Sequence, residues 1–260
     1  MQGSKSWGED ITRYNDCRLP LKSISKMSAA IALALVLASC TRDPLPDFPR
    51  IVLWAWESPQ DLSFIDPLET GIAFLAKTVL IGGGTARVLP RRDPLHVPPG
   101  TALMSVVRVQ SSGGQLPDAA EVAPAIAEAA KLAGVRALQI DFDATFSERD
   151  FYRELIGKIR AQVAASVPIT ITALASWCRY DNWIADFPVA DAVPMLFRMG
   201  PDRYKPGEKF RLSLCRSSVG ISTDEPILKL PRVRRVYIFH PGPWTKPDYQ
   251  NALQEVKRWI

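Results

Sequence analysis

Short apolar runs recur along the chain from residue 51 onward, and turn residues or helix-like segments separate them. Their length and their content of β-branched residues predict buried strands. We expect eight such strands, at Ile51–Trp56, Ala76–Ile81, Leu103–Val109, Ala137–Phe142, Ile169–Ala175, Ala192–Phe197, Val219–Ser222 and Val236–Phe239.

Several of the segments between these strands carry a helical pattern, most clearly in the second half of the chain. The first has acidic residues early and Lys131 late, and Gly134 follows it, as helix ends favour. The second begins with Ser-x-x-Asp, which resembles a capping box. We expect helices at Pro117–Ala133, Ser147–Ala165, Asp181–Phe187 and Pro247–Ile260.

Strands that alternate with helices predict a compact (β/α)8 TIM-like barrel, with residues 50–260 as a single domain. The first three strands lack convincing helices between them, because Leu80–Pro99 is rich in glycine and proline and predicts a hairpin or a loop. A doubly wound open sheet is the alternative fold.

Residues 1–39 are typical of a leader with a signal peptide. The run from Ala29 to Ala38 is apolar but far shorter than the roughly 20 residues that cross a bilayer, and Lys22 and Lys26 precede it. The run ends in Leu-Ala-Ser-Cys40, which is similar to the lipobox of bacterial lipoproteins. We therefore expect cleavage before Cys40 and a lipid on its thiol. A buried helix with a chance cysteine is the alternative.

A lipid on Cys40 would place the protein in the bacterial cell envelope, with the lipid bilayer as its partner. Thr41 stands where an aspartate favours inner-membrane retention in enteric bacteria, so we expect the periplasmic face of the outer membrane. Residues 40–49 contain three prolines and predict a short stiff tether. Residues 1–20 fit neither a signal nor a domain, and initiation at Leu21 would give a normal leader.

Composition and charge argue against several classes of protein. The hydrophobic share of 47% and the charged share of 23% are those of an ordinary globular protein. The net charge of +5 is modest, and no aromatic-basic module accompanies the pair Arg91-Arg92 or the group around Arg234, so we expect no nucleic-acid binding. Phosphate-loop, zinc-site and serine-hydrolase motifs are absent from the sequence, so we expect no cofactor and no metal.

Two cysteines, Cys178 and Cys215, follow the leader and the lipobox. An oxidising periplasm favours a disulfide between them. The sequence does not fix their separation, so two separately buried thiols are the alternative.

The fourth predicted strand carries the most specific candidate site, because barrel chemistry lies at the carboxyl ends of strands. Side chains alternate along a strand, so Gln139, Asp141 and Asp143 share one face while Ile140 and Phe142 share the other. The apolar face must meet the helices, so the polar face points into the barrel. We expect the two aspartates to raise each other's pKa and to act as acid or nucleophile. An ion-pair network that only organises the barrel is the alternative.

Other strand ends supply further candidates. Glu225 and Glu57 are additional candidate catalytic acids, and flat indole rings suit the faces of pyranose sugars. Candidate substrate-binding residues are Trp54, Trp56, Gln139, Arg108, Trp177, Arg198, Asp224 and His240, with Trp244 as a further indole. Core tryptophans, loop-capping carboxylates and a structural histidine are the alternatives. A divalent cation held by Asp141, Asp143 and Asp224 is a further interpretation.

Five blocks of the sequence resemble a bacterial family of domains of unknown function, number three-one-four-two. They cover most of residues 50–245 and read Val52-Leu-Trp-Ala-Trp-Glu57, Leu138-Gln-Ile-Asp-Phe-Asp143, Ile171-Thr-Ala-Leu-Ala-Ser-Trp-Cys178, Val193-Pro-Met-Leu-Phe-Arg-Met-Gly200 and Gly220-Ile-Ser-Thr-Asp-Glu225. The family has no established activity, and its architecture is loosely similar to glycoside-hydrolase barrels.

Chitinase-like barrels offer the nearest functional analogy, since their fourth strand ends Asp-x-x-Asp-x-Asp-x-Glu. Asp141 and Asp143 match the second and third acidic positions, whereas Leu138 replaces the first and Thr145 replaces the catalytic glutamate. A proton donor would have to be Asp143 or one of the two candidate glutamates. The sequence thus predicts an envelope lipoprotein with a glycoside-hydrolase-like barrel that binds a polysaccharide and is positioned to hydrolyse it. A non-catalytic periplasmic lipoprotein that binds a glycan or a protein is the alternative.

Overall fold

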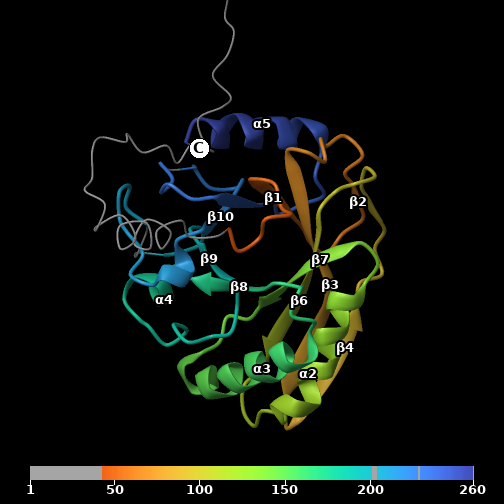
Figure 1. Cartoon of the computed structure of the whole chain (residues 1–260), viewed down its shortest axis with the longest axis vertical. Coiled ribbons are helices and arrows are strands. Elements are labelled where there is room, and N and C mark those ends of the chain that lie inside the picture. The colour runs from red at the N-terminus through yellow and green to blue at the C-terminus, as the bar shows by residue number, and fades with distance from the viewer. Residues whose placement is uncertain (1–42, 201–203, 228, 260) are drawn as a thin grey trace, which may run out of the picture. The chain divides into compact units, whose positions relative to one another are not determined.

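Eight parallel strands form a closed barrel in the computed structural model, which describes residues 43–200, 204–227 and 229–259 (Figure 1). The strands are β1 (Ile51–Ala55), β3 (Thr70–Gly82), β6 (Leu103–Ser111), β7 (Val135–Asp141), β8 (Ile169–Leu174), β9 (Asp191–Met195), β10 (Ser218–Ser222) and β11 (Arg235–Phe239). Each is hydrogen-bonded to the next, and β1 pairs with both β11 and β3. This double pairing closes the ring and excludes the open doubly wound sheet. All eight expected strands are present.

Helices cover only part of the barrel. The connection from β6 to β7 contains α2 (Ala119–Ala127) and η1 (Glu128–Lys131), and that from β7 to β8 contains η2 (Phe146–Glu148) and α3 (Arg149–Gln162). The remaining helices are α4 (Ala175–Arg179) after β8, η3 (Ser213–Cys215) before β10 and α5 (Lys246–Lys257) after β11. Figure 1 shows α2 and α3 side by side outside the strands, where they contact each other.

The first two barrel connections contain strands in place of helices. A hairpin joins β3 to the antiparallel β4 (Thr85–Pro90), as the glycine-rich sequence predicts. A separate small sheet pairs β2 (Gln60–Asp61) with β5 (Leu95–His96). No described helix is both long and apolar enough to cross a bilayer. The predicted leader and the lipidation site Cys40 lie outside the described residues.

One expected helix is wrong. Residues 181–187 form a turn, because the carboxylate of Asp181 accepts hydrogen bonds from the backbone N–H groups of Asn182 at 2.8 Å and Trp183 at 3.2 Å. Such a side-chain turn competes with helix formation. The helix near this position is α4, which begins at Ala175, where the expected strand was to end.

The period of two along each strand produces two concentric cores. Ile140 of β7 and Phe142, just after the strand, lie in the outer core. They pack between the strands and residues of α3 such as Tyr152. Alternate side chains fill the lumen and form the inner core, which includes Val52, Ala73, Met104, Val106, Ala137, Val193 and Tyr237. The predicted inward face of β7 is therefore the lumen face.

Trp54 of β1 fills the middle of the lumen. Its indole N–H donates a hydrogen bond of 2.7 Å to Oε1 of Gln139, and Nε2 of Gln139 donates one of 3.2 Å to Thr170. The far edge of the ring lies against β10, where a Cβ on Gly220 would come within 2.7 Å of Cη2 of Trp54. Only glycine leaves room for the indole at this level of the barrel.

Residues 43–50 close the amino-terminal end of the lumen. Leu45 is fully buried, and Phe48 packs in the inner core. The guanidinium of Arg235, at the start of β11 and 1% exposed, donates hydrogen bonds to the carbonyl oxygens of Leu45 (2.8 Å), Phe48 (3.1 Å) and Pro49 (3.1 Å). Most of the segment expected to form a tether thus packs within the compact unit, which begins at Asp43. Its two buried apolar side chains account for this placement.

A disulfide joins Cys178 of α4 to Cys215 of η3, with Cα atoms 5.8 Å apart. It closes a loop with a sequence separation of 37 residues, and this loop contains β9. A cross-link over a loop of that length stabilises a fold chiefly by restricting the unfolded chain.

We predict that Gly220→Ala lowers the free energy of unfolding by about 1–3 kcal/mol, because the added methyl group overlaps the Trp54 indole. Gly157→Ala in α3 is the matched control. Its new Cβ would have no neighbour within 4 Å, and alanine favours a helix, so stability should stay equal or rise by about 1 kcal/mol. Urea unfolding followed by circular dichroism measures both. Equal stability of the two variants would show that Trp54 does not occupy this space.

Candidate functional site

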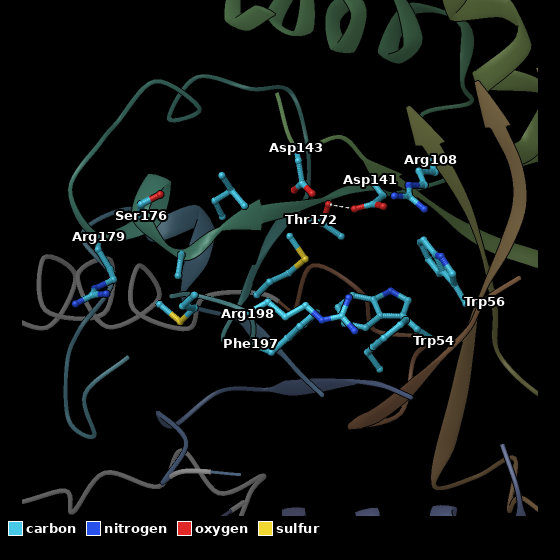
Figure 2. Close-up of a pocket in the computed structure, with 15 residues that line it drawn as sticks. Trp54, Trp56, Arg108, Asp141, Asp143, Thr172, Ser176, Arg179, Phe197 and Arg198 are labelled. Carbon is cyan, nitrogen blue, oxygen red and sulfur yellow. Dashed lines mark hydrogen bonds between the residues drawn. The ribbon is translucent and has the colours of Figure 1, made fainter. Parts of the chain in front are cut away.

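A cavity of about 440 Å³ opens at the carboxyl ends of the barrel strands (Figure 2). Its lining residues come from β1, β6, β7, β8, β9 and β11 and from the segments that follow them. Trp54 lines the cavity while also filling the lumen beneath, so it forms the floor. The site therefore lies where barrel enzymes hold their chemistry.

Asp141 and Asp143 both line this cavity, from the end of β7. Oδ1 of Asp141 accepts a hydrogen bond of 2.7 Å from the hydroxyl of Thr172 on the adjacent strand β8, as the dashed line in Figure 2 marks. Asp143 lies beyond the end of the strand and is exposed to water, whereas Asp141 is partly buried. The pair thus places one recessed and one exposed carboxyl group on the same wall.

The two carboxyl groups have raised pKa values. Burial raises the pKa of Asp141 to about 6, and the negative charge of Asp143 adds to this effect. The hydroxyl of Thr172 and the charge of Arg108 oppose it. Burial also raises the pKa of Asp143, and Arg108 opposes that shift too. Water reaches both groups through the open mouth, yet the surrounding protein replaces much of their hydration.

Two arginines line the cavity, Arg108 half-buried and Arg198 exposed. Arg108 of β6 lies 3.8 Å from Glu57, and its guanidinium is 6.0 Å from the centre of the Trp56 ring. Arg198 forms an ion pair of 3.3 Å with Asp224. Its backbone has a φ of 53°, and its N–H donates to Glu225 at 2.8 Å. Arg108 therefore acts on the acidic pair, and the carboxylates that pair with the two arginines lie outside the cavity lining.

Aromatic side chains form much of the remaining wall. Phe197 and Phe239 stack in parallel with ring centres 5.9 Å apart, and Trp56 meets Phe239 edge-on at 6.2 Å. Phe239 thus packs against both other rings, and the three form an apolar surface in the same cavity as the two carboxyl groups. This combination suits a ligand with one apolar face and several hydroxyl groups, as pyranose sugars have.

The structure brings together six of the predicted site residues in this cavity and places the others elsewhere. The six are Trp54, Trp56, Arg108, Asp141, Asp143 and Arg198. Glu57, Asp224 and Glu225 contact the two arginines from outside the lining. Figure 2 shows the acidic pair close to Arg108, whereas Ser176 and Arg179 lie at the far end.

Four predicted ligand contacts have structural positions instead. Gln139 is fully buried beneath the floor, and Trp177 packs against Trp183 in the outer core. Trp244 is buried and donates its indole N–H to the carbonyl oxygen of Trp54 at 3.0 Å. His240 bonds Thr223 at 2.7 Å and lines a separate shallow cavity beside α5. The polar groups of Gln139, Trp244 and His240 thus have partners within the protein.

The sequence does not single out four residues that shape the site, one of which is Phe197 in the aromatic wall. Thr172 and Phe239 lie on the lumen faces of β8 and β11, and the alternation Thr170, Thr172 was a signal that could have identified the first. Arg91 belongs to the basic pair Arg91-Arg92 of the sequence. Its guanidinium donates hydrogen bonds to the carbonyl oxygens of Trp56 and Ser58, both at 2.6 Å. It holds the segment after β1 in place, and no local pattern in the sequence indicates this role.

A metal-binding interpretation of the carboxylates is wrong for the described part of the chain. No group of three or more histidine, cysteine, aspartate or glutamate side chains there is arranged to hold an ion. Asp224, the expected third ligand, bonds Ser222 and Arg198 instead.

Comparison of the chain with family models, with curated proteins and with solved structures finds no match in any of the three. The family resemblance of the sequence blocks therefore stays a prediction.

The raised pKa of Asp141 predicts how stability changes with pH. The folded state binds this proton more tightly than the unfolded state, in which the pKa is near 3.8, so Asp141 loses its stabilising effect as the pH rises toward and past 6. Each pKa unit corresponds to about 1.4 kcal/mol. Asp141→Asn should thus match the parent near pH 4 and exceed its free energy of unfolding by about 1–3 kcal/mol at pH 7.

Urea unfolding at both pH values measures this difference. Asp150→Asn, which removes an exposed carboxyl group from α3, is the control for a general change in charge. If the Asp141→Asn difference does not grow with pH beyond that of the control, burial does not raise this pKa.

Proposed function

We propose that the mouth cavity binds a saccharide of a cell-envelope or extracellular polysaccharide and that Asp141 and Asp143 hydrolyse one of its glycosidic bonds. The observation that carries the proposal is the position of two raised-pKa carboxyl groups beside an aromatic wall. Glycoside hydrolysis needs one carboxyl group that is protonated and one that is ionised. We further infer that the fold is a (β/α)8 barrel in which strands replace the first helices.

The two aspartates would divide the chemistry according to their surroundings. Asp141, with a pKa of about 6, is the general acid that protonates the glycosidic oxygen as its bond to the anomeric carbon breaks. Asp143 is the more exposed group and takes a proton from the water that attacks this carbon. The net change is the addition of one water across the bond. Turnover should then fall as the pH rises through about 6.

The surrounding residues support binding. Trp56 and the stacked pair of Phe197 and Phe239 present ring faces and edges to a pyranose. Arg108 and Arg198 can donate hydrogen bonds to ring hydroxyls or to an acidic substituent. These contacts need no proton transfer, so binding would persist without catalysis.

One feature favours a purely glycan-binding protein as a second candidate. Thr145, at the position of the chitinase-like glutamate, is the N-cap of η2 and forms a capping box with Glu148. Its backbone N–H and its hydroxyl both bond the Glu148 carboxylate at 2.7 Å. The Glu148 carboxylate therefore stabilises a helix cap. The carboxyl groups that line the first cavity and could transfer protons are those of the aspartate pair.

A glycan array followed by hydrolysis assays tests the proposed activity. Asp141→Asn and Asp143→Asn should each lower turnover at least about 100-fold and leave the Kd for the bound glycan within about threefold. Trp56→Ala should weaken binding about tenfold. Asp150→Asn is the control and should retain both properties.

The outcomes separate the two candidates. Binding without turnover in the parent protein would support the glycan-binding protein. An array on which no glycan binds, together with unchanged behaviour of the aspartate variants, would contradict both.

We also propose that the protein is held at the periplasmic face of the outer membrane by a lipid on Cys40. The disulfide between Cys178 and Cys215 supports an oxidising compartment. Cells that express the parent chain should incorporate labelled palmitate into it, and Cys40→Ser should abolish the label and leave the precursor uncleaved. Label in the Cys40→Ser variant, or none in the parent, would contradict the anchor.

A further inference from the structure

A second cavity adjoins the first and shares its acidic wall. It has a volume of about 320 Å³ and lies beyond the ends of β6 and β7. Arg108, Asp141 and Asp143 line both cavities. The acidic pair therefore borders both recesses.

The two recesses differ in chemistry. The first is lined by the aromatic residues of the site. The second has no tryptophan in its lining and combines charged, hydroxyl and amide groups, such as those of Gln110, Ser111 and Ser147, with the apolar side chains of Val109, Leu116 and Phe142. Gly113 and Gly114 border the second recess, and a Cβ on either would have no neighbour within 4 Å. This side thus offers open polar surface that suits a hydroxyl-rich ligand.

An exposed aromatic residue lies in the sequence between two residues that line the second recess. Phe146 is 82% exposed and lies between Thr145 and Ser147, which both line the recess. The guanidinium of Arg149 packs 5.0 Å from the centre of the Phe146 ring. Arg149 is itself fixed by an ion pair of 2.6 Å with Asp181. A phenylalanine that is held in place yet left in water is unusual, and exposed aromatic rings commonly mark binding surfaces.

We propose that the site takes a linear polysaccharide chain that spans both recesses, so that the bond over Asp141 and Asp143 is internal to the chain. Neither end of the polysaccharide would need to enter the site, because the acidic pair borders both recesses and the chain would extend into each. Phe146 stacks on a sugar unit at the far side of the second recess. This inference rests on the proposed saccharide binding and adds the substrate class, an extended chain bound at internal units.

Binding of oligosaccharides of graded length tests the inference. The probes are β-1,4-linked oligomers of glucose and of N-acetylglucosamine and α-1,4-linked oligomers of galacturonate, each from one to six units. Each series is titrated calorimetrically against the full chain. In the series that binds, affinity should rise with each added unit until the chain fills both recesses. Phe146→Ala should weaken the longest oligomer about fivefold to tenfold and leave the shortest binding oligomer unchanged.

Two further variants complete the test. Leu68→Ala removes another exposed apolar side chain, 87% exposed and outside both recesses, and should bind every oligomer as the parent does. Ser147→Trp narrows the second recess and should abolish the gain from added units while short oligomers still bind.

The result that overturns the inference is distinct from failure of the proposed function. If oligomers bind but affinity stops rising at the first recess, and Phe146→Ala behaves as Leu68→Ala does, the extended-chain inference is wrong and saccharide binding stands. If no oligomer and no glycan on the array binds, the proposed function fails and the inference fails with it.

Discussion

A closed ring of eight parallel strands directs every second side chain of each strand into one narrow lumen. Space and solvation in that lumen then decide the residue at each level. At the middle level the indole of Trp54 fills the width of the barrel. Its buried N–H donates a hydrogen bond to Gln139, and its ring fits only because Gly220 has no side chain. At the lower level Arg235 and the segment from Asp43 exclude water. Only the upper level stays open, and the candidate site lies there.

The same constraint explains why two aspartates with raised pKa values have different roles. Burial raises the pKa of Asp191, at the lower level, to about 7, but this residue is fully buried and bonds Ser218. Burial raises the pKa of Asp141 to about 6 at the upper level, where a cavity connects it to water. A perturbed pKa alone therefore does not identify a site. Access to solvent through the cavity distinguishes the second case.

Much of the fold follows from the sequence, because strand periodicity and turn residues are local signals. All eight strands, the hairpin after β3 and the inward face of β7 could be predicted in this way. Depth within the barrel could not, and so Gln139 was expected to contact a ligand although it lies beneath the floor. The roles of Arg91 and of the segment before β1 depend on contacts between residues far apart in the chain. The leader and its lipid stay predictions from the sequence.

The account depends on a carboxyl group whose pKa is raised to about 6 while water can reach it. Carbon-13 NMR titration of the aspartate carboxyl groups tests this directly, with the Asp141 signal identified by its loss in Asp141→Asn. The account predicts a titration midpoint near 6 for that signal. A midpoint at or below the ordinary value of about 4 would show that the mouth of the barrel does not perturb the acidic pair, and would remove the physical basis of the proposed site.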